Sequence, residues 1–326
     1  MQSYWISANT GQITLERRDA PLPEPGPHQV LVRLRAASLN RGEFIPSHGL
    51  HAGAGSAKPA GNEGAGDIVK TGADVKHLAA GQRVMGRCAG AFAEFGLMDD
   101  REAMPVPPSL SYEEAAAVPL AFLVVYDMLV AQGHLASNEW LLVTGVSSGV
   151  GVAALQTAKA LNARVIGTSG SAAKLERLQA LGLDHGLCTR NADFHDSVMR
   201  ITKNAGANLI VNAVGGSVFV ECIRTLAYEG RLATVGYVDG IMESTVDLDA
   251  LHAKRLTLFG VSNKLRSAEQ RVPLIKGFTA DILPLIAAGR IHPLIDRIFP
   301  FDELPAAREH MEANRHVGKI VITMPG

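Results

Sequence analysis

The chain has 326 residues, of which 47% are hydrophobic and 19% are charged, and its formal net charge is −1. A chain of this length can bury one large core or two smaller ones, and we expect two domains. A near-neutral charge without long basic runs excludes the electrostatic pattern of a nucleic-acid binder or of an anionic-membrane binder, so the expected partner is a small molecule.

Cysteine usage and the apolar runs predict a cytoplasmic protein. Cys88, Cys188 and Cys222 lie far apart, form neither a disulfide framework nor a structural zinc pattern, and favour a reducing compartment. The first twelve residues lack the cationic start and apolar stretch of a secretory signal. The longest apolar run, 115–126, contains Pro119 and ends before Asp127, so it is well short of a membrane span.

Residues 13–108 contain short apolar runs separated by glycine and proline, which predicts a compact β-rich domain. Ser111 and Glu114 then form a capping-box pattern before an apolar stretch that reaches Val130, and Pro119 is expected to divide this stretch into two helices. We therefore expect a first domain over residues 1–120 and a second over residues 121–263.

The stretch 140–151, WLLVTGVSSGVG, changes from an apolar run to a small-residue turn and then to an amphipathic helix. The apolar run predicts a strand buried on both faces, and Gly145, Gly149 and Gly151 permit a tight turn with close backbone approach. The first N–H groups of the helix have no partner inside it and favour an anion. The glycines of such a turn can also be needed for packing alone. The strands that follow are therefore needed to distinguish nucleotide binding from packing.

Strand patterns recur at 164–169, 208–214, 230–236 and 256–262, and a helical period occupies 171–181. This alternation predicts a doubly wound parallel α/β sheet, with a ligand at the carboxyl ends of its strands. After 263, a helical stretch at 268–288, a strand RIFPF, a helix through Glu312 and a last strand GKIVITM follow. We expect this tail, 264–326, to return to the first domain, with the active site between the two domains.

The end of the second strand of the sheet predicts which dinucleotide binds. A site for NAD usually has an acidic residue there, about 20 residues past the glycines, to hold the ribose 2′-hydroxyl. This chain has Ser169 and Ser171, with Lys174 one turn later and Arg190 directly after the third strand, HGLCT (185–189). Hydroxyl groups and cations suit a 2′-phosphate, which favours NADPH. The alternative is that Lys174 and Arg190 are solvated surface charges.

Four segments resemble the medium-chain dehydrogenase/reductase superfamily along nearly the full length of the chain. They are SLNRGE (38–43), GNEGAGDIVKTGADVKHLAAGQRVMG (61–86), VTGVSSGVG (143–151) and GRIHPLIDRIFPFDELPAAREHMEANRHVGKIVI (289–322). The resemblance implies a GroES-like catalytic domain, a Rossmann domain, NADPH as hydride donor, and a homodimer joined through the edge strands of the Rossmann sheets.

Within this superfamily, the chain looks like the zinc-free quinone oxidoreductase branch. The zinc alcohol dehydrogenases place a cysteine where this chain has Asn40 and a histidine where it has Asn62, and amides are poor zinc ligands. The four cysteines of the structural zinc lobe are also missing. His48 and His51 lack a third ligand and are interpreted as ordinary loop residues. Without a Lewis acid, hydride transfer to a quinone or to the β-carbon of an enone remains.

The resemblance also assigns candidate site residues. Asn40 is the best candidate to stabilise the developing oxyanion, with Arg41, Asn62 and Tyr126 as weaker candidates. The alternative is that Asn40 only holds the loop after its strand. A substrate-side tyrosine of well-known quinone reductases falls at Ile45 and a threonine near the nicotinamide falls at Val124, so the acceptor pocket is less polar than in those relatives.

The cofactor is expected to contact the glycine-rich turn and the ends of the later strands. In the turn, the AxxGxxG pattern of the family has Gly145, Ser148 and Gly151 at the matching positions. Asn314 or Arg315 is expected to reach the 2′-phosphate. The other expected cofactor contacts are Ser147, Ser148, Gly149, Val150, Val214, Gly215, Gly236, Tyr237, Ser262, Asn263 and Lys264.

The sequence also allows three alternative interpretations. The turn also resembles the TGxxxGxG turn of short-chain dehydrogenases, but their YxxxK is absent, because Leu232 follows Tyr228 and Ile241 follows Tyr237 at the lysine position. The chain could instead bind NADPH as a redox sensor or structural protein with little turnover. Within the enzyme interpretation, enoyl reduction, including that of thioesters, stays open beside quinone reduction.

Overall fold

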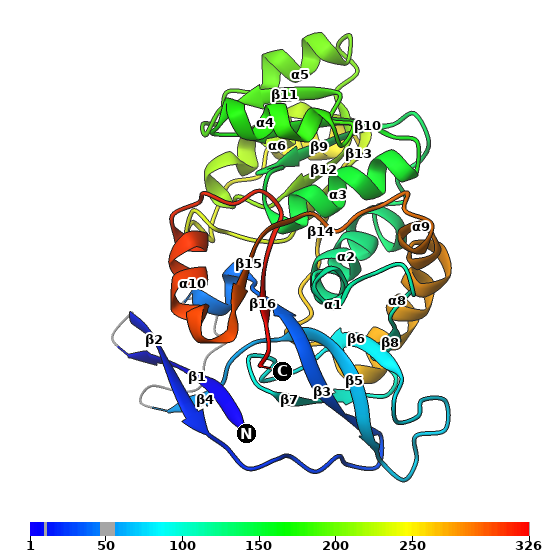
Figure 1. Cartoon of the computed structure of the whole chain (residues 1–326). Helices are drawn as coiled ribbons and strands as arrows, with labels where there is room; N and C mark the ends of the chain where they lie inside the picture. The colour runs from blue at the N-terminus through cyan, green and yellow to red at the C-terminus, as the bar shows by residue number, and fades with distance from the viewer. Residues whose placement is uncertain (10–11, 46–55, 326) are drawn as a thin grey trace. The chain divides into compact units, whose positions relative to one another are not determined.

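A computed structural model describes residues 1–9, 12–45 and 56–325. The chain divides into two compact units. Unit 1 comprises Met1–Leu120, Ser267–Thr279 and Ala287–Gly326, and unit 2 comprises Ala121–Arg266 and Ala280–Ile286. Figure 1 shows the C-terminal strands, in red, within the same unit as the N-terminal strands, in blue. The predicted α/β class, with a β-rich part and a parallel sheet, is confirmed.

The main sheet of unit 1 joins strands from the two ends of the chain. Its order is β15 (Ile295–Pro300), β16 (Lys319–Thr323), β3 (Gln29–Ser38), β5 (Glu63–Thr71), β6 (Arg83–Arg87) and β8 (Met104–Pro105), and β7 (Phe95–Asp99) also pairs with β3. A three-stranded sheet has the order β2 (Gln12–Asp19), β1 (Gln2–Asn9) and β4 (Ala57–Pro59). β16 runs antiparallel to β3, with Val321 opposite Ser38. This pairing brings the start of β16 to the loop after β3.

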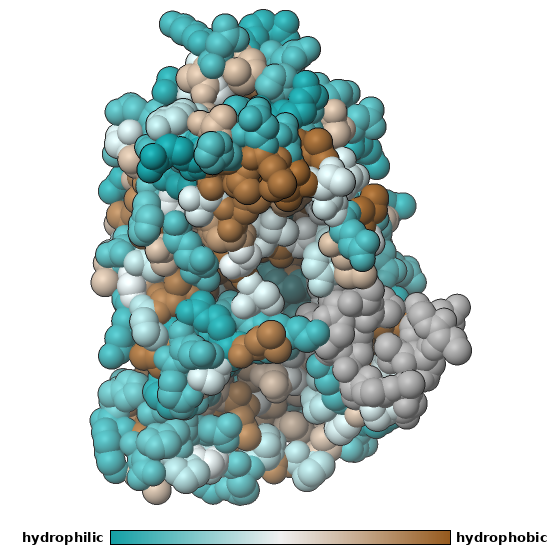
Figure 2. Space-filling view, turned by 180° about the vertical axis from the view of Figure 1, so that it is seen from behind, coloured by the Kyte–Doolittle hydropathy of each residue, from teal (hydrophilic) through white to brown (hydrophobic). Residues whose placement is uncertain are grey.

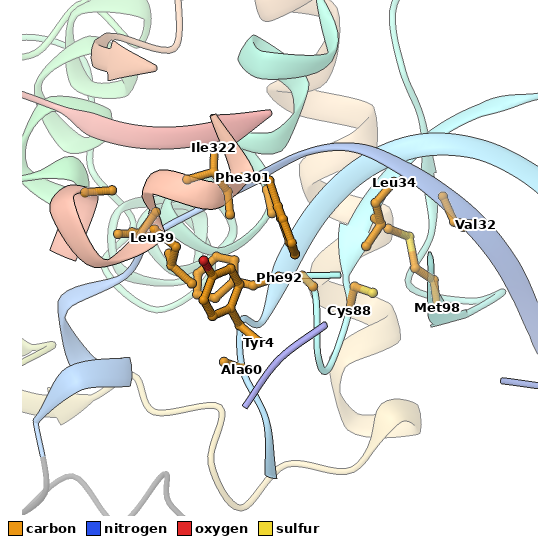
Figure 3. Close-up of a cluster of buried hydrophobic side chains, with 14 of the residues drawn as sticks. Tyr4, Val32, Leu34, Leu39, Ala60, Cys88, Phe92, Met98, Phe301 and Ile322 are labelled. Atoms are coloured by element: carbon orange, nitrogen blue, oxygen red, sulfur yellow. The ribbon is translucent and has the colours of Figure 1, made fainter. Parts of the chain in front are cut away.

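The core of unit 1 lies between these strands and the C-terminal segment. Figure 3 shows Tyr4, Leu39, Phe92, Phe301 and Ile322 in one cluster, and all five side chains are buried. The rings of Tyr4 and Phe301 are 5.0 Å apart at 57°, a tilted arrangement that aromatic pairs favour. The first and last strands of the chain are therefore held together by apolar packing.

Gly66 sets how closely β5 approaches β3. A Cβ atom at Gly66 would lie 2.0 Å from the backbone oxygen of Arg33, a distance that no side chain can occupy. The pairing of β3 with β5 also shifts register twice, which bends both strands. Glycine is needed here for close backbone approach.

Capping and proline signals set a further group of helices, which are divided between the two units. Ser111 caps α1 (Tyr112–Ala116) and forms the predicted capping box with Glu114. Pro119 begins α2 (Pro119–Tyr126), so the predicted break there is confirmed. The helix predicted at 268–288 is in fact two helices, α8 (Ala268–Asp281) and α9 (Leu283–Ala287), and α10 (Leu304–Glu312) follows. Two 3₁₀ segments, Arg41–Phe44 and Phe301–Glu303, complete this list of short elements.

Unit 2 contains a six-stranded parallel sheet. Its strands in order are β11 (His185–Cys188), β10 (Arg164–Ser169), β9 (Trp140–Thr144), β12 (Ala207–Asn212), β13 (Leu226–Thr234) and β14 (Thr257–Gly260). In chain order this is 3-2-1-4-5-6, the order of Rossmann sheets. β9 is buried along its whole length, as its apolar run predicted. β13 begins at Leu226 rather than Gly230, and Glu229 within it has a φ of 55°.

Helices pack against this sheet and connect its strands. They are α3 (Gly149–Ala160), α4 (Ala172–Gln179), α5 (His195–Ile201), α6 (Phe219–Thr225) and α7 (Leu248–Ala253), and Gly216–Val218 is a 3₁₀ segment. A π-helical segment, Asp127–Ala131, continues α2. Because every strand pair is parallel, all strand-to-helix turns that follow the carboxyl ends gather at one edge of the sheet.

None of the helices in the described residues is long and apolar enough to span a membrane. Figure 2 shows a face on which polar side chains predominate, with hydrophobic side chains in smaller groups among them. Scattered exposed hydrophobic side chains are ordinary on a folded chain.

Candidate active site

The turn between β9 and α3 is built around two glycines and a serine cap. Gly145 has a φ of +66°, and a Cβ atom at Gly151 would lie 2.6 Å from the backbone oxygens of Gly145 and Val146. Ser148 Oγ accepts a hydrogen bond from Gly151 N at 3.0 Å and caps α3. The turn is therefore a tight cradle at the N-terminus of a twelve-residue helix, a position that favours a phosphate.

Hydroxyl groups and a guanidinium gather at the end of β10. Ser169 Oγ lies 3.4 Å from Ser147 Oγ. The Arg190 side chain lies against Gly170, because a Cβ atom there would be 2.1 Å from Arg190 Nε. Ser171 caps α4 by accepting a hydrogen bond from Lys174 N at 3.4 Å. The residues predicted to select the cofactor thus lie on adjacent strand ends and one helix start of unit 2.

Asn212, at the end of β12, shapes the loop that contains Val214 and Gly215. Its Oδ1 accepts hydrogen bonds from the N–H groups of Val214 and Gly215, both at 3.1 Å, and its Nδ2 donates to Gly215 O at 2.9 Å. Thr144 Oγ1 donates to the same Oδ1 at 3.2 Å. Asn212 was not among the residues predicted from the sequence, although a polar residue that ends an apolar strand was a usable signal.

Asp239 fixes the loop after β13, which follows Gly236 and Tyr237. It accepts hydrogen bonds from Ser217 N and Ile241 N, both at 2.9 Å. Burial raises the pKa of Asp239, but the hydrogen bonds from Ser217 and Ile241 hold it below its ordinary value. A Cβ atom at Gly215 would lie 2.0 Å from Asp239 Oδ1, so only glycine fits beside this carboxylate.

The loop after β14 presents a buried amide oxygen. Oδ1 of Asn263 is buried and has no hydrogen-bond partner among the described residues. Its neighbours Ser262 and Lys264 are joined by a hydrogen bond from Lys264 N to Ser262 Oγ at 3.2 Å. A buried acceptor without a donor is costly in a folded protein, so Asn263 is a suitable position for a ligand N–H.

A buried polar cluster lies in unit 1, where β3, β5 and β16 meet. Lys319 Nζ donates to Asn40 Oδ1 at 2.8 Å, to Glu63 Oε1 at 2.9 Å and to Leu39 O at 3.0 Å. Asn40 Nδ2 donates to Glu63 Oε1 at 2.8 Å and to Glu43 Oε1 at 3.1 Å. Lys319, Glu63 and Glu43 are 6%, 0% and 5% exposed. Asn40 was predicted from the sequence as a site residue, whereas these three charged residues were not.

Glu43 is a buried carboxyl group with a raised pKa. Burial raises the pKa of its carboxyl group to about 7, and the amide side chains of Asn62 and Asn40 counteract part of that increase. Oε2 of Glu43 has no hydrogen-bond partner among the described residues. A carboxyl group in this setting can change charge in the neutral pH range.

Arg41 and Tyr126 have other partners. Arg41 Nη2 donates to Met311 O at 2.8 Å and to Asn314 Oδ1 at 2.7 Å, within unit 1. Tyr126, in unit 2, donates to Asp281 Oδ2 at 2.6 Å. Burial, followed by this hydrogen bond, raises the pKa of Tyr126 to about 12. Tyr126 is thus a poor proton donor at neutral pH.

The remaining predicted residues are distributed over both units. Arg315 is exposed and belongs to unit 1, as does Asn314. Gly149 and Val150 form the first turn of α3. His48 and His51 lie outside the described residues. Across 1–9, 12–45 and 56–325, no three His, Cys, Asp or Glu side chains are grouped so as to hold a metal ion.

Two family models match the chain, one on each unit. The model for the alcohol dehydrogenase GroES-like domain matches residues 26–108, and the model for the zinc-binding dehydrogenase matches residues 149–275. Together with the Rossmann strand order, these matches confirm the predicted combination of a GroES-like domain with a Rossmann sheet.

Known proteins resemble the chain over nearly its whole length. A spectinabilin polyketide synthase system protein, NorB, of Streptomyces orinoci is 33% identical over 94% of this chain, but the chain spans only 14% of that protein. The structure of the CurK enoyl reductase is 25% identical, covers 100% of both chains and has a TM-score of 0.85. The structure of an Escherichia coli quinone oxidoreductase complexed with NADPH is 24% identical, covers 99% of this chain and 100% of the other, and has a TM-score of 0.87.

Proposed function

The chain belongs to the medium-chain dehydrogenase/reductase superfamily, and we propose that it is a zinc-independent oxidoreductase that transfers a hydride from NADPH to a polarised double bond or a quinone. The observation that carries this proposal is the composition of the buried cluster in unit 1. Asn40 stands at a position where zinc alcohol dehydrogenases have a metal ligand, and an ammonium group, Lys319 Nζ, lies 2.8 Å from its oxygen. An amide oxygen held by a cation is not available to a second cation.

The strand ends of unit 2 are suited to a dinucleotide. The cradle at Gly151, which a Cβ atom would fill, would hold the pyrophosphate at the start of α3. Ser169, Lys174 and Arg190 would hold the 2′-phosphate, since hydroxyl and cationic groups favour it. The unpartnered Oδ1 of Asn263 would accept an N–H of the cofactor. When bound, the nicotinamide would supply the hydride.

The proposed role of Asn40 is changed by its contacts. Both N–H groups of its amide point at carboxylates, Glu63 and Glu43, so they are not directed at an acceptor oxygen. We propose that Asn40 positions the loop after β3, which was the alternative stated for it from the sequence. In the GroES-like unit, the Asn40 amide is thus held within a buried polar cluster and does not act as a hydrogen-bond donor to the acceptor.

For the acceptor, we propose an α,β-unsaturated carbonyl compound, including thioesters. Support comes from the 25% identical CurK enoyl reductase, which this chain matches over its full length. The matched polyketide synthase protein is 33% identical to the chain over a segment that makes up 14% of its own length. A quinone is the second candidate acceptor, because its reduction also places charge on a carbonyl oxygen.

The test is NADPH oxidation by the chelator-treated protein with a crotonyl thioester, a free enone and an ortho-quinone, with NADH in parallel. Turnover that survives chelation and prefers NADPH supports the proposal, and kcat/KM ranks the acceptors. Loss of activity with the chelator would contradict zinc independence. Cofactor binding without turnover on any acceptor would favour the sensor role.

Lys174→Ala tests the cofactor assignment, with Lys203→Ala as a matched control on the same unit. We expect the first variant to raise KM for NADPH at least tenfold more than KM for NADH, because a cation beside the 2′-phosphate contributes about 1.5–3 kcal/mol. Lys203 lies on an exposed turn after α5, and its replacement should change neither KM value. Equal effects of Lys174→Ala on both cofactors would contradict the assignment.

We also propose a homodimer formed through β14, which is one of the two edge strands of the six-stranded sheet. An edge strand offers unpaired backbone groups to a second copy. The three described cysteines are free thiols, which suits a reducing compartment such as the cytoplasm. Light scattering on the purified chain tests the dimer, and a monomer at micromolar concentration would contradict it.

A further inference from the structure

We propose that the buried pair Glu43 and Glu63 holds one exchangeable proton at neutral pH, that Glu43 carries it, and that this proton completes the reduction of the acceptor. The first two statements stand on the structure of unit 1 alone. The third rests on the proposed reductase function. Glu43 would donate the proton that each turnover consumes and would then regain one from solvent.

The count of fully buried charges favours one bound proton. Two carboxyl groups, Glu43 and Glu63, share one buried ammonium group, that of Lys319, and none of the three side chains is more than 6% exposed. With all three ionised, the cluster would have a net charge of −1 away from water, which is costly. One added proton makes it neutral. Two carboxyl groups that share one site keep one proton between them for the same reason.

The hydrogen bonds show which carboxyl group holds the proton. Glu63 Oε1 accepts from Ser38 Oγ at 2.5 Å, Asn40 Nδ2 at 2.8 Å and Lys319 Nζ at 2.9 Å, and its Oε2 accepts from Leu120 N at 2.6 Å. Four donors, one of them charged, favour the ionised form of Glu63. Glu43 has only neutral amide donors, Asn40 at 3.1 Å from Oε1 and Asn62, and its Oε2 has no partner among the described residues. An oxygen without a donor is where a proton can reside.

The groups around Glu43 agree with this assignment. Among the described residues, those that face it are Asn40, Asn62 on the turn before β5, Glu63 on β5, Lys58 on β4 and Lys319 on β16. Burial raises the pKa of Glu43 more than these neighbours lower it. Lys58, the middle residue of the three-residue strand β4, is partly exposed, whereas Lys319 is buried.

A small cavity gives the proton a way to exchange. It has a volume of about 10 Å³ and is lined by Glu43, Lys58 and Asn62, with Ile6, Phe44 and Phe92 among the apolar residues of its wall. A cavity of this size holds about one water molecule, and three polar side chains are enough to bind it. A water here would connect the carboxyl group of Glu43 with the ammonium group of Lys58, which reaches solvent.

With Glu43 as the proton donor, every proton and electron of the proposed reaction is accounted for. Hydride adds to the β-carbon of the acceptor, and the electron pair of the double bond moves to the carbonyl oxygen. The resulting enolate takes up one proton as the O–H bond of Glu43 breaks, and a C–H bond forms at the α-carbon. The cofactor is oxidised by two electrons and the acceptor is reduced by two. Glu43 is left as a carboxylate and regains a proton from solvent through the cavity.

One experiment detects the protonated carboxyl group by infrared spectroscopy, and a second measures whether its proton is used in turnover. Infrared difference spectra of the full chain between pH 6 and pH 9 should show the C=O stretch of a buried carboxylic acid at the lower pH. The band should be absent in Glu43→Gln and retained in Glu102→Gln. Glu102 is a matched control, because it is also 5% exposed in unit 1 but is paired with Arg271. Absence of the band in the unmodified chain would overturn the proposal, whatever the variants do.

Turnover measurements test whether the Glu43 proton is used in catalysis. We expect kcat of the unmodified chain to fall as pH rises above 7, and Glu43→Gln to lower kcat about 100-fold at neutral pH and remove this dependence. Glu102→Gln should keep the profile of the unmodified chain. Identical profiles in Glu43→Gln and the unmodified chain would overturn the use of this proton in catalysis. No turnover in any form of the protein would instead refute the reductase function, while the infrared band still decides whether Glu43 holds a proton.

Discussion

Glu43 should make unit 1 less stable as the pH rises, and Glu43→Gln should remove this effect. The pKa of Glu43 is raised from 4.5 to about 7 in the folded protein. Below pH 4.5 the group is protonated in both states, so its contribution to stability is fully present. As pH rises through 7, the unfolded chain has already released the proton that the folded chain must also release, and the contribution is lost.

The size of the effect follows from the two pKa values. The interval from 4.5 to about 7, at about 1.4 kcal/mol for each pH unit, amounts to about 3 kcal/mol of unfolding free energy. Glutamine has nearly the same shape as glutamic acid and does not titrate. Between pH 4.5 and pH 8, the unfolding free energy of Glu43→Gln should therefore fall by about 3 kcal/mol less than that of the unmodified chain.

The assay is denaturant unfolding at several pH values, with a fluorescence signal that reports on unit 1. The chain has two tryptophans, Trp5 in unit 1 and Trp140 in unit 2, so a Trp140→Phe background leaves only Trp5. Glu102→Gln, with the same burial, controls for the loss of a buried carboxyl group. Parallel pH dependences for the unmodified chain and Glu43→Gln would refute the reasoning.

Three further predictions concern both units. Lys319→Met should lower the unfolding free energy of unit 1 by about 3–5 kcal/mol, because it leaves the buried Glu63 without its cation; a loss below 1 kcal/mol in denaturant unfolding would contradict this. Gly151→Ala should abolish NADPH binding measured by cofactor fluorescence, since its Cβ atom would lie 2.6 Å from two backbone oxygens of the turn; unchanged affinity would show that the turn does not hold the cofactor. Ser148→Ala should cost about 1 kcal/mol through the lost cap of α3, and a thermal melt of the full chain with no shift would contradict that role.

The parallel sheet of unit 2 could be predicted from the sequence because its signals are local. The apolar run of β9, the glycines after it and the alternation of strands with helices occur within short stretches, and they imply where the strand ends gather. The positions of Ser169 and Arg190 at adjacent strand ends follow from the same logic. Element limits such as the start of β13 and the break between α8 and α9 could not be predicted, because tertiary contacts set them.

The cluster in unit 1 was decided only by tertiary structure. Lys319 and Glu63 are 256 residues apart in the sequence, and they meet because β16 pairs with β3 beside β5. No local pattern shows that Glu43 is buried, that its Oε2 lacks a donor, or that both N–H groups of Asn40 are directed at carboxylates. The sequence determined which polar residues the chain has near the expected site. Their chemistry depends on burial and on partners brought together by long-range strand pairing, which sequence spacing does not encode.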